Sequence, residues 1–346
     1  MSRLESLFNR CWYGRGPGCG LFVVLLAPLS LVFRGLVALR RWFYALGLTA
    51  QVRLPVPVIV VGNLTTGGAG KTPLTLALVA WLKEAGYRPG IISRGYGGHH
   101  GGQADAPMAV DADTDPDLAG DEPVLMASRS GCPVWVGRQR AAAGQGLLAR
   151  HPEVDVLVAD DGLQHLALAR DIEVVVVDGA RGLGNGWLLP AGPLRESPRR
   201  LGQADAVVVN GPGAAWNGGG YAMTLVGSRF RNLRTSGGDA SARDFAGMEV
   251  HALAGIGNPR RFFDHLAGLG LRVVAHPFPD HHAYEYKDLP PGPLVMTEKD
   301  AVKVAPLVQA TGRQDAWYLE IDAMVDGGLK DLILNRLREV HGPQAA

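Results

Sequence analysis

The stretch VIVVGNLTTGGAGKTPLTLALVAWL, from Val58 to Leu82, decides the fold of this chain. Its β-branched start predicts a buried strand, a glycine-rich loop follows, and Lys71-Thr72 opens an amphipathic helix. This order is typical of a P-loop. The backbone N–H groups of residues 67–71 can wrap a polyphosphate, Lys71 can reach its β and γ oxygens, and the Thr72 hydroxyl can coordinate Mg²⁺. Thr65 replaces the usual glycine six residues before the lysine, but the context still predicts binding of a nucleoside triphosphate.

Short apolar runs alternate with helix-length stretches through the rest of the chain. Continuous β-branched runs are typical of strands buried on both faces, and the intervening helices indicate βαβ units. The expected strands are 56–61, 88–92, 133–136, 154–159, 172–177 and 206–209, then 250–254, 271–275, 293–296 and 317–321, with later helices near 259–269 and 329–340. We therefore predict an α/β fold, with a P-loop NTPase-type, mostly parallel sheet, helices on both faces and a second, smaller α/β domain.

A glycine-rich turn region at residues 211–221, together with the stretch 222–226 and the basic stretch 228–234 that follow it, marks the joint between the two series of strands. We predict a basic, apolar N-terminal helical segment over residues 1–50, a P-loop domain over 51–226 and the smaller α/β domain over 227–346. Residues 99–119 read as a loop.

The composition indicates a globular protein and restricts its partners. Hydrophobic residues make up 47% of the 346 residues and charged residues 19%, enough for a large core. Lys plus Arg number 34 against 33 Asp plus Glu, so the net charge of +1 does not indicate a nucleic-acid partner. The three cysteines have no C-x-x-C spacing, which indicates neither a disulfide framework nor a structural zinc site and suits a reducing compartment.

Positive charge and apolar character are concentrated at the N-terminus. Seven arginines precede residue 55 against the single acid Glu5, and the thirteen residues Leu21–Phe33 carry no charge. A helix of that length reaches about 20 Å, short of the roughly 30 Å hydrocarbon core, and Pro28 interrupts the run, so we do not expect a membrane span. Flanking aromatic and arginine residues favour a monotopic segment in the headgroup region of an anionic membrane. The alternatives are a helical hairpin packed on the protein's own core and a secretory signal peptide.

Asp160 and Asp161 follow the expected strand at 154–159. The carboxyl ends of strands in a P-loop fold face the phosphates, so the sequence predicts that these aspartates coordinate Mg²⁺, directly or through water. The alternative is an ordinary turn, because Asp-Asp-Gly is also turn chemistry.

Asp121 and Arg94 are candidates at the same edge. Asp121 opens a helix, where aspartate is often an N-cap, but it can also orient and deprotonate an acceptor hydroxyl. Arg94 ends the second expected strand, and its alternative is a surface salt bridge. In the second domain, His281 and His282 follow a strand, and neighbouring histidines alone indicate a metal site only weakly. The T-E-K-D run at 297–300 does not match a guanine-reading N-K-x-D, so we do not predict GTP.

Together these motifs resemble those of a known family. The chain contains, in order between residues 61 and 301, VGNLTTGGAGKTP, SRGYGG, GDEP, DDGLQH, DGARGLGNGWLLPAGPLRE, AGIGNPRRFF, FPDHH and TEKDA. These are similar to motifs of the tetraacyldisaccharide 4′-kinase family of lipid A biosynthesis. The resemblance implies Mg²⁺-dependent transfer of the ATP γ-phosphate to the 4′-hydroxyl of a tetraacyldisaccharide 1-phosphate, forming lipid IVA. It also implies a peripheral position at the cytoplasmic face of the inner membrane of a Gram-negative bacterium, and no obligate protein partner.

The resemblance also assigns roles to single residues. Asp121, in G-D-E, would take the hydroxyl proton, and His281, in F-x-D-H, would reach over from the second domain to hold and tune it. The expected metal ligands are Thr72, Asp160, Asp161 and Glu122. The residues expected to meet phosphate or sugar are Arg94, Asn185 and Arg195. The expected ATP-binding residues are Thr65, Thr66, Gly67, Gly68, Ala69, Gly70, Lys71 and Thr72, with Lys71 also catalytic.

Two other functions stay open. A nucleotide-driven switch or assembly ATPase would hydrolyse ATP without an acceptor and would not need His281. A P-loop kinase of a soluble sugar would keep its activity without residues 1–48. For a kinase, we expect closure of the two domains to exclude water that would otherwise be phosphorylated.

Overall fold

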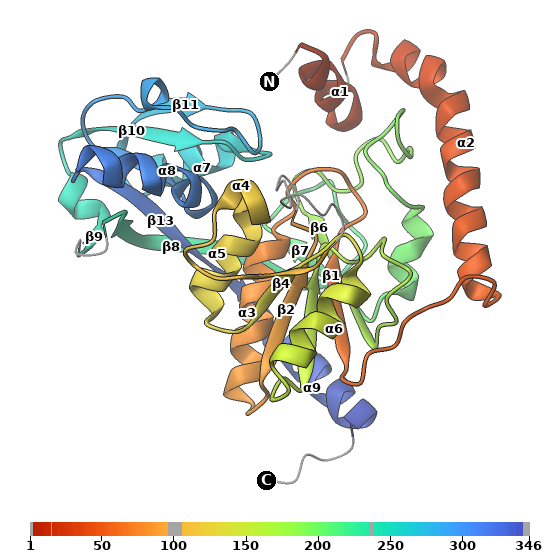
Figure 1. Cartoon of the computed structure of the whole chain (residues 1–346). Coiled ribbons are helices and arrows are strands. Elements are labelled where there is room, and N and C mark those ends of the chain that lie inside the picture. The colour runs from red at the N-terminus through yellow and green to blue at the C-terminus, as the bar shows by residue number, and fades with distance from the viewer. Residues whose placement is uncertain (1–2, 15, 96–105, 235–237, 342–346) are drawn as a thin grey trace.

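The structure is a computed structural model that describes residues 3–14, 16–95, 106–234 and 238–341. Two α/β lobes are joined by long strands, and a long helix lies along the outer edge of the larger lobe (Figure 1). We call the larger lobe, which holds residues 58–82, the P-loop lobe, and the smaller one the second lobe. Of the loop expected at 99–119, residues 99–105 lie outside the described residues, and the remainder holds strand β3 and helix α4.

The P-loop lobe has a mostly parallel sheet with β1 near its middle. β1 pairs in parallel with β5 on one side and β6 on the other, and β3 is antiparallel to β4. The strands are β1 (Val58–Gly62), β2 (Pro89–Ser93), β3 (Met108–Val110), β4 (Val134–Val136), β5 (Val156–Asp160), β6 (Ile172–Asp178) and β7 (Ala206–Asn210). Every strand expected in this part of the sequence is present, so the loop after β1 and the residues after β5 share one edge of the sheet.

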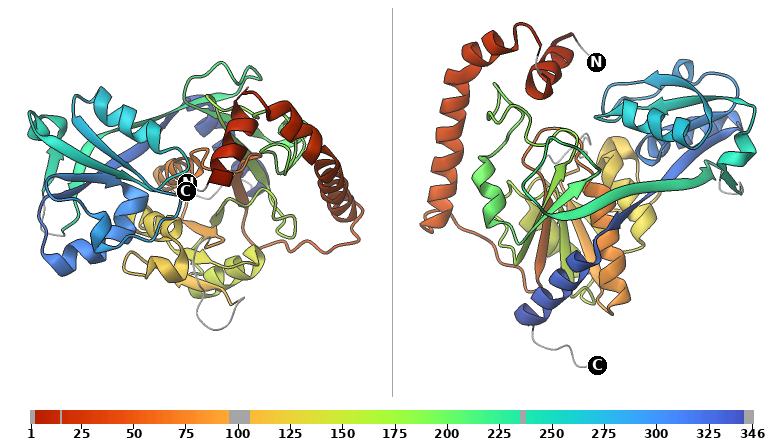
Figure 2. Two further views of the ribbon diagram at one scale, coloured as in Figure 1. Left: turned by 90° about the horizontal axis from the view of Figure 1, so that it is seen from above. Right: turned by 180° about the vertical axis from the view of Figure 1, so that it is seen from behind.

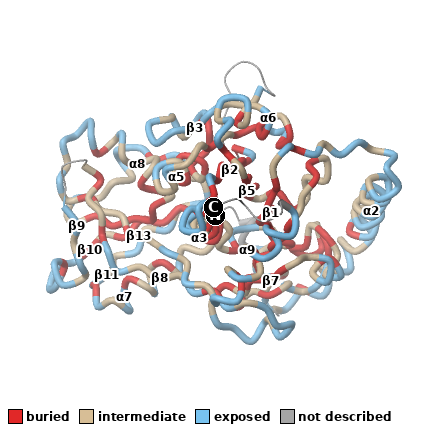
Figure 3. The backbone as a smooth tube through the Cα atoms, turned by 90° about the horizontal axis from the view of Figure 1, so that it is seen from below, coloured by how far each residue is buried: buried red, intermediate tan, exposed pale blue. Residues whose placement is uncertain are grey.

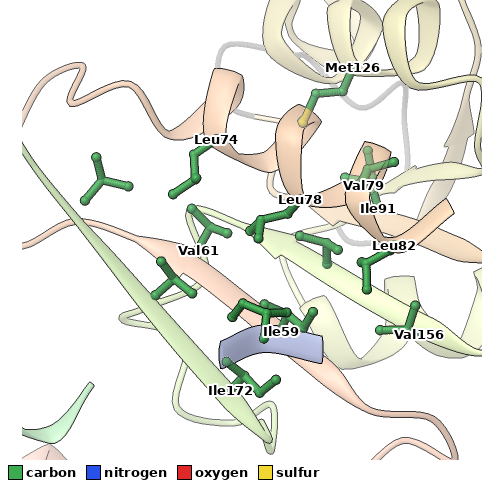
Figure 4. Close-up of a cluster of buried hydrophobic side chains, with 14 of the residues drawn as sticks. Ile59, Val61, Leu74, Leu78, Val79, Leu82, Ile91, Met126, Val156 and Ile172 are labelled. Atoms are coloured by element: carbon green, nitrogen blue, oxygen red, sulfur yellow. The ribbon is translucent and has the colours of Figure 1, made fainter. Parts of the chain in front are cut away.

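Helices cover both faces of this sheet, as predicted. One buried cluster contains side chains of α3, α5 and α9, and the cluster on the other face contains α6. Leu74, Leu78 and Leu82 of α3 are spaced four residues apart and pack with Ile59 of β1 (Figure 4). The helices are α3 (Lys71–Glu84), α4 (Pro116–Ala119), α5 (Asp121–Ser130), α6 (Arg140–Arg150) and the 3₁₀ helix η1 (Pro198–Gln203).

The second lobe continues the same sheet. Its strands β10, β11 and β12 are parallel, and β13 joins them to β8, which pairs with β7. The order across the 13-stranded sheet is β11-β10-β12-β13-β8-β7-β6-β1-β5-β2-β4-β3, with β9 paired to β8. The elements of this lobe are β8 (Tyr221–Asn232), β9 (Asp239–Ser241), η2 (Ala242–Phe245), β10 (Glu249–Ala254), α7 (Pro259–Gly268), β11 (Arg272–Pro277), η3 (Tyr286–Asp288), β12 (Leu294–Thr297), α8 (Glu298–Thr311) and β13 (Ala316–Val325). The helix that follows them is α9 (Gly327–His341).

The sequence did not predict this continuity. The boundary placed between residues 226 and 227 falls inside β8, a long and mostly half-exposed strand. After β13 the chain returns to the P-loop lobe, where Leu329, Ile333 and Leu337 of α9 are buried in the same cluster as Ile59. The three-part division of the chain stays a prediction.

The N-terminal hairpin consists of α1 (Arg3–Tyr13) and α2 (Cys19–Ala45), and α2 lies on the side of the molecule away from the second lobe (Figure 2). The expectation that Pro28 interrupts the apolar run is wrong, because α2 continues through it for 27 residues, roughly 40 Å. Proline removes one backbone N–H donor from the helix. The residues on both sides of Pro28 remain helical, so α2 loses a hydrogen bond at this point but is not broken. By length and composition alone, α2 is long and apolar enough to cross a membrane.

One face of α2 packs against the P-loop lobe. The Ser30 hydroxyl donates to the Leu188 carbonyl at 2.8 Å and accepts from the Ala191 amide at 2.9 Å. Arg41 Nη1 lies 2.6 Å from Glu196 Oε2. The opposite face is exposed (Figure 3), and its exposed apolar residues are Leu21, Val24, Leu25, Leu29, Leu31, Val32, Leu36, Leu39, Trp42 and Phe43.

Candidate active site

The loop between β1 and α3 has the geometry of a phosphate cradle. Gly67 and Gly70 have φ values of 96° and 93°, a left-handed region that suits glycine, and Lys71 is the first residue of α3. Lys71 Nζ lies 3.4 Å from Asn63 Oδ1 and 3.6 Å from Asp161 Oδ1. The predicted loop, lysine and strand-end carboxylate are therefore together at a helix N-terminus, where partial positive charge favours anions.

Asn210, at the end of β7, supports this loop and was not predicted from the sequence. Its Nδ2 donates to the Ala69 carbonyl at 2.9 Å, and its Oδ1 accepts from Arg261 Nη2 of the second lobe at 3.1 Å. A Cβ placed on Gly70 would be 2.3 Å from the same Nδ2, so this position requires glycine. The sequence shows a polar residue, Asn210, at the end of an apolar strand. To place that residue beside the P-loop, however, one must know the order of the strands in the sheet.

Asp160 and Asp161 differ in their surroundings. Asp160 is fully buried, and its Oδ1 accepts from Thr75 Oγ1 at 3.1 Å, whereas its Oδ2 has no hydrogen-bond partner. Burial, together with the charge of Glu122, raises the pKa of Asp160 to about 7. Burial alone would also raise the pKa of Asp161, but Lys71 and Arg195 outweigh it and lower that pKa.

The unpartnered oxygen of Asp160 fits a magnesium site. In the described part of the chain, no three His, Cys, Asp or Glu residues are grouped closely enough to hold a metal by themselves. Mg²⁺ commonly uses one or two carboxylates together with substrate phosphates and water, so a full protein cage is not required. The Asp160 carboxylate and the hydroxyl of Thr72, in the first turn of α3, are oxygen ligands of the kind that this ion prefers.

Asp121 meets His281 across the two lobes. Asp121 is the first residue of α5, buried, and its Oδ2 lies 3.1 Å from His281 Nδ1, while its Oδ1 accepts from the Glu122 amide at 2.9 Å. Burial alone would raise the pKa of Asp121, but the His281 hydrogen bond and the charge of Lys299 lower it to about 2. Burial lowers the pKa of His281, and its bond to Asp121 more than compensates, so the net shift is upward.

The tandem histidines face different partners. His282 Nε2 lies 3.1 Å from Asp288 Oδ2, and its ring stacks on Phe278 with centroids 4.6 Å apart. His281 has a positive φ of 58°, and Asp161 has one of 47°; in the described ranges no other non-glycine residue has a positive φ. Such backbone strain is concentrated at functional sites, and here both positions are site candidates.

Two lysines of α8 complete the surroundings of Asp121, and the sequence did not assign them a role. Lys299 Nζ lies 3.1 Å from Glu122 Oε1 and 3.3 Å from His281 Nε2. Burial alone would lower the pKa of Lys299, but the charges of Glu122, Asp121 and Asp280 outweigh it and raise that pKa. Lys303 Nζ lies 3.4 Å from Asp121 Oδ2. Their spacing of four residues at the start of a helix was a signal that both side chains share one face.

The predicted substrate contacts occupy different places. Arg195 Nη1 lies 3.3 Å from Asp161 Oδ1. Asn185 bonds to the protein backbone, with Nδ2 donating to the Ala191 carbonyl at 2.9 Å and to the Cys11 carbonyl of α1 at 3.3 Å. Arg94 is exposed at the end of β2, and Glu122 is engaged by Lys299. Contact of these residues with a ligand stays a prediction.

Two pockets lie beside this edge of the sheet. One pocket, of about 310 Å³, lies between α2 and the P-loop lobe. It is lined by Phe33, Val37, Arg40, Arg41, Gln164, Leu166, Leu189, Arg195 and Glu196. The other, of about 280 Å³, lies at the ends of β6 and β7 against α7 and is lined by Asp178, Ala180, Asn210, Gly211, Pro212, Asn258, Arg260, Arg261 and Asp264. The first combines apolar and cationic groups, and the second adjoins the residue that supports the P-loop.

Comparison with known proteins identifies the family. The sequence model described as tetraacyldisaccharide-1-P 4′-kinase matches residues 22–338. Tetraacyldisaccharide 4′-kinase of Azoarcus sp. strain BH72 is 50% identical over 339 residues, covering 96% of each chain. The enzyme of that name from Chromobacterium violaceum is 50% identical over 344 residues, covering 97% of this chain and 99% of its own.

A solved structure agrees with the sequence comparison. LpxK from Aquifex aeolicus, crystallised in complex with ATP, superposes with a TM-score of 0.73 at 28% identity. The match covers 91% of this chain and 99% of that one. Sequence and fold thus agree over nearly the whole length, and the chain belongs to the tetraacyldisaccharide-1-P 4′-kinase family.

Proposed function

We propose that this enzyme transfers the γ-phosphoryl group of ATP to the 4′-hydroxyl of a tetraacyldisaccharide 1-phosphate, forming lipid IVA in lipid A biosynthesis. One observation carries the proposal: Asp121 meets His281 of the second lobe at the sheet edge that bears the P-loop, in a chain of this family. A phosphate cradle and a carboxylate held across two lobes are what transfer to a hydroxyl requires.

The polyphosphate of ATP would bind residues 65–72, with Lys71 on its β and γ oxygens. We assign the nucleoside end of ATP to the pocket at the ends of β6 and β7, since ligands of such sheets bind outside the carboxyl ends of the strands. The ATP complex of Aquifex LpxK supports this choice of nucleotide.

Thr72 and Asp160 would hold Mg²⁺. When bound, this ion would neutralise charge on the β and γ phosphates. Asp161 and Glu122 have lysine partners, Lys71 and Lys299, so their role as metal ligands stays a prediction. The unpartnered oxygen of Asp160 supports this assignment.

Asp121 would receive the proton of the 4′-hydroxyl. A carboxylate with a pKa of about 2 is a weak base, so its main contribution is to orient the hydroxyl. The proton moves late, when bond formation to phosphorus makes the hydroxyl acidic. His281 and the Glu122 amide each bond one oxygen of Asp121 and fix the direction in which its remaining lone pairs point.

The acceptor would lie between α2 and the P-loop lobe. The pocket there places Phe33 and Val37 beside Arg195, a mixture that suits an acylated sugar phosphate. Arg195 also reaches Asp161, which connects this pocket to the phosphate edge. Arg94 and Asn185 remain predicted contacts of the same substrate.

We further propose that α2 lies in the headgroup region of the inner membrane at its cytoplasmic face. The outer face of α2 is apolar and exposed, and arginines and aromatic residues flank it. The inner face is bound to the P-loop lobe through Ser30, so a helix crossing the bilayer would carry these contacts into hydrocarbon. A monotopic arrangement avoids that cost.

The test is transfer of radiolabel from [γ-³²P]ATP with Mg²⁺ to a tetraacyldisaccharide 1-phosphate in detergent micelles, beside Lys71→Ala and a control without lipid. A labelled lipid that disappears with Lys71→Ala supports the proposal. Label released as free phosphate equally with and without lipid would point to the ATPase switch. Transfer to short soluble sugars that survives removal of residues 1–48 would point to the soluble-sugar kinase.

A further inference from the structure

The end of α1 lies on the P-loop. Tyr13 is the last residue of α1, and its hydroxyl donates a hydrogen bond to the Thr66 carbonyl at 3.2 Å. Burial raises the pKa of Tyr13, so the hydroxyl keeps its proton at neutral pH and can donate. A side chain of the N-terminal hairpin therefore holds the backbone of the proposed ATP loop.

Arg181, in the loop after β6, joins the same tyrosine to the second lobe. Its guanidinium lies over the Tyr13 ring, 5.2 Å from the centroid, and its Nη2 donates to the Gly257 carbonyl at 3.1 Å. A Cβ placed on Gly67 would be 3.7 Å from Arg181 Nη1, so the guanidinium is directly beside the P-loop. Three parts of the molecule meet at this pair: α1, the P-loop and the second lobe.

The neighbouring contacts make α1 a rigid connection. Trp12 Nε1 donates to the Pro190 carbonyl at 3.0 Å, and the Trp12 carbonyl accepts from the Asn185 amide at 2.8 Å. The Phe8 ring meets Phe22 of α2 edge to face, with centroids 5.0 Å apart. A restraint on α2 therefore reaches Tyr13 through packed side chains and hydrogen bonds.

We propose that Tyr13 and Arg181 are positioning residues of the nucleotide site, through which attachment of α2 to a lipid surface raises the affinity of the P-loop for ATP. The inference rests on the proposed function for the identity of the nucleotide and of the surface. A surface that holds the exposed face of α2 limits the motion of α1, and α1 then keeps the P-loop in its binding conformation. By linkage, ATP strengthens attachment to the surface by the same factor.

The test measures the affinity of the full chain for a fluorescent ATP analogue, with and without vesicles of anionic phospholipid and with no acceptor lipid present. We expect vesicles to tighten binding by the wild type by about twofold to tenfold, the range of one net hydrogen bond. Tyr13→Phe keeps the ring under Arg181 and loses the bond to Thr66, so most of the vesicle effect disappears. Tyr13→Ala loses both contacts and binds ATP more weakly in either condition.

The matched control is Tyr286→Phe, which removes the hydroxyl of an exposed tyrosine in the second lobe. It should bind ATP like the wild type in both conditions. In turnover assays Tyr13→Phe should raise KM for ATP while kcat is kept, a split that general loss of folded enzyme would not produce.

The inference is overturned if the wild type does not bind the vesicles, if vesicles leave its ATP affinity unchanged, or if Tyr13→Phe keeps the full vesicle effect. Because the assay contains no acceptor, its result is separate from the kinase test. Coupling without lipid phosphorylation would reject the proposed function alone, and phosphorylation without coupling would reject this inference alone.

Discussion

Asp121 and Asp160 are both buried carboxylates, and their surroundings move their pKa values in opposite directions. Asp121 is surrounded by His281, Lys299 and Lys303, so its charge is favoured despite burial. Asp160 accepts one hydrogen bond from the Thr75 hydroxyl, and its other oxygen has no hydrogen-bond partner, so burial disfavours its charged form. The first arrangement suits a fixed carboxylate that meets a hydroxyl, and the second suits a site completed by a cation.

Asp121→Asn tests the assignment of the base. The amide keeps the size of the side chain but loses the charged oxygen that orients the hydroxyl and receives its proton, so we expect kcat to fall by about 10² to 10⁴, with KM for ATP nearly unchanged. Steady-state transfer of radiolabel to lipid measures both constants. Asp113→Asn, on an exposed loop residue, is the control and should behave like the wild type. A collapse of ATP affinity with kcat preserved would show that Asp121 is a cap or metal residue.

Asp160→Asn tests the metal assignment through stability. The Asp160 carboxyl ionises near pH 4 in the unfolded chain and near pH 7 in the native protein. Between these two pH values the native protein therefore binds one more proton than the unfolded chain does. The contribution of Asp160 to stability therefore falls as pH rises through this window. Without Mg²⁺, we expect the Tm of Asp160→Asn to equal that of the wild type near pH 4 and exceed it at pH 8.

Adding Mg²⁺ at pH 8 should then raise the Tm of the wild type and leave that of Asp160→Asn unchanged. Equal responses of the two proteins to Mg²⁺ would remove Asp160 from the metal site.

At this scale, the sequence predicted residues carried by local motifs and missed those that depend on strand order. Asp121 and His281 were named from separate motifs, and in the structure Asp121 Oδ2 lies 3.1 Å from His281 Nδ1. The catalytic roles of the two residues stay predictions. Asn210 and Lys303 were not assigned, because their proximity to the P-loop and to Asp121 follows from the neighbours of β7 and from the packing of α8. No short pattern in the chain encodes that proximity.

Among the elements, α2 departs most from what the sequence predicted. The strands were predicted well, because apolar runs buried on both faces have sharp ends. In α2, Pro28 lies inside the helix and does not interrupt it, because one missing backbone donor does not end a helix whose other residues favour it. Its two faces also differ, with Ser30 and Phe33 turned to the lobe and an apolar outer face left exposed.

Leu25→Glu tests whether the outer face of α2 binds lipid. Leu25 is 68% exposed, so the change should not disturb the fold, but it places a charge where we propose that the helix enters the headgroup region. We expect affinity for anionic vesicles to fall by at least about tenfold. Cosedimentation measures it, with Met324→Glu as control, since Met324 is 64% exposed on β13. Equal losses in both variants would contradict the proposed orientation.

For the whole molecule, the decisive feature is that one sheet runs through both lobes. The sequence predicted two α/β units but not that β8 and β13 run between them. A strand shared by two lobes has the same local sequence pattern as a strand that lies within one lobe. Charged contacts add to this connection. Arg129 of α5 is bonded to Glu298 of α8 and lies 2.5 Å from Asp322 of β13.

Arg129→Ala should weaken the junction of the lobes. It leaves Glu298 buried without its cation, and burial already raises the pKa of that group, so we expect about 3 to 5 kcal/mol of lost stability. Denaturant unfolding measures the change. Arg260→Ala removes an exposed partner of Asp264 and should cost less than about 1 kcal/mol. Similar small losses in both variants would mean that the junction does not depend on this cluster.

The return of α9 to the P-loop lobe has a consequence for how the protein is made. Domains of a growing chain generally fold in the order in which they are synthesised. Here the P-loop and most of its sheet are synthesised early, but their core lacks Leu329, Ile333 and Leu337 until the last helix has been made. The second lobe is complete before the lobe that precedes it in the chain. The ATP site can therefore mature only late in biosynthesis, after the region that carries His281 has already left the ribosome.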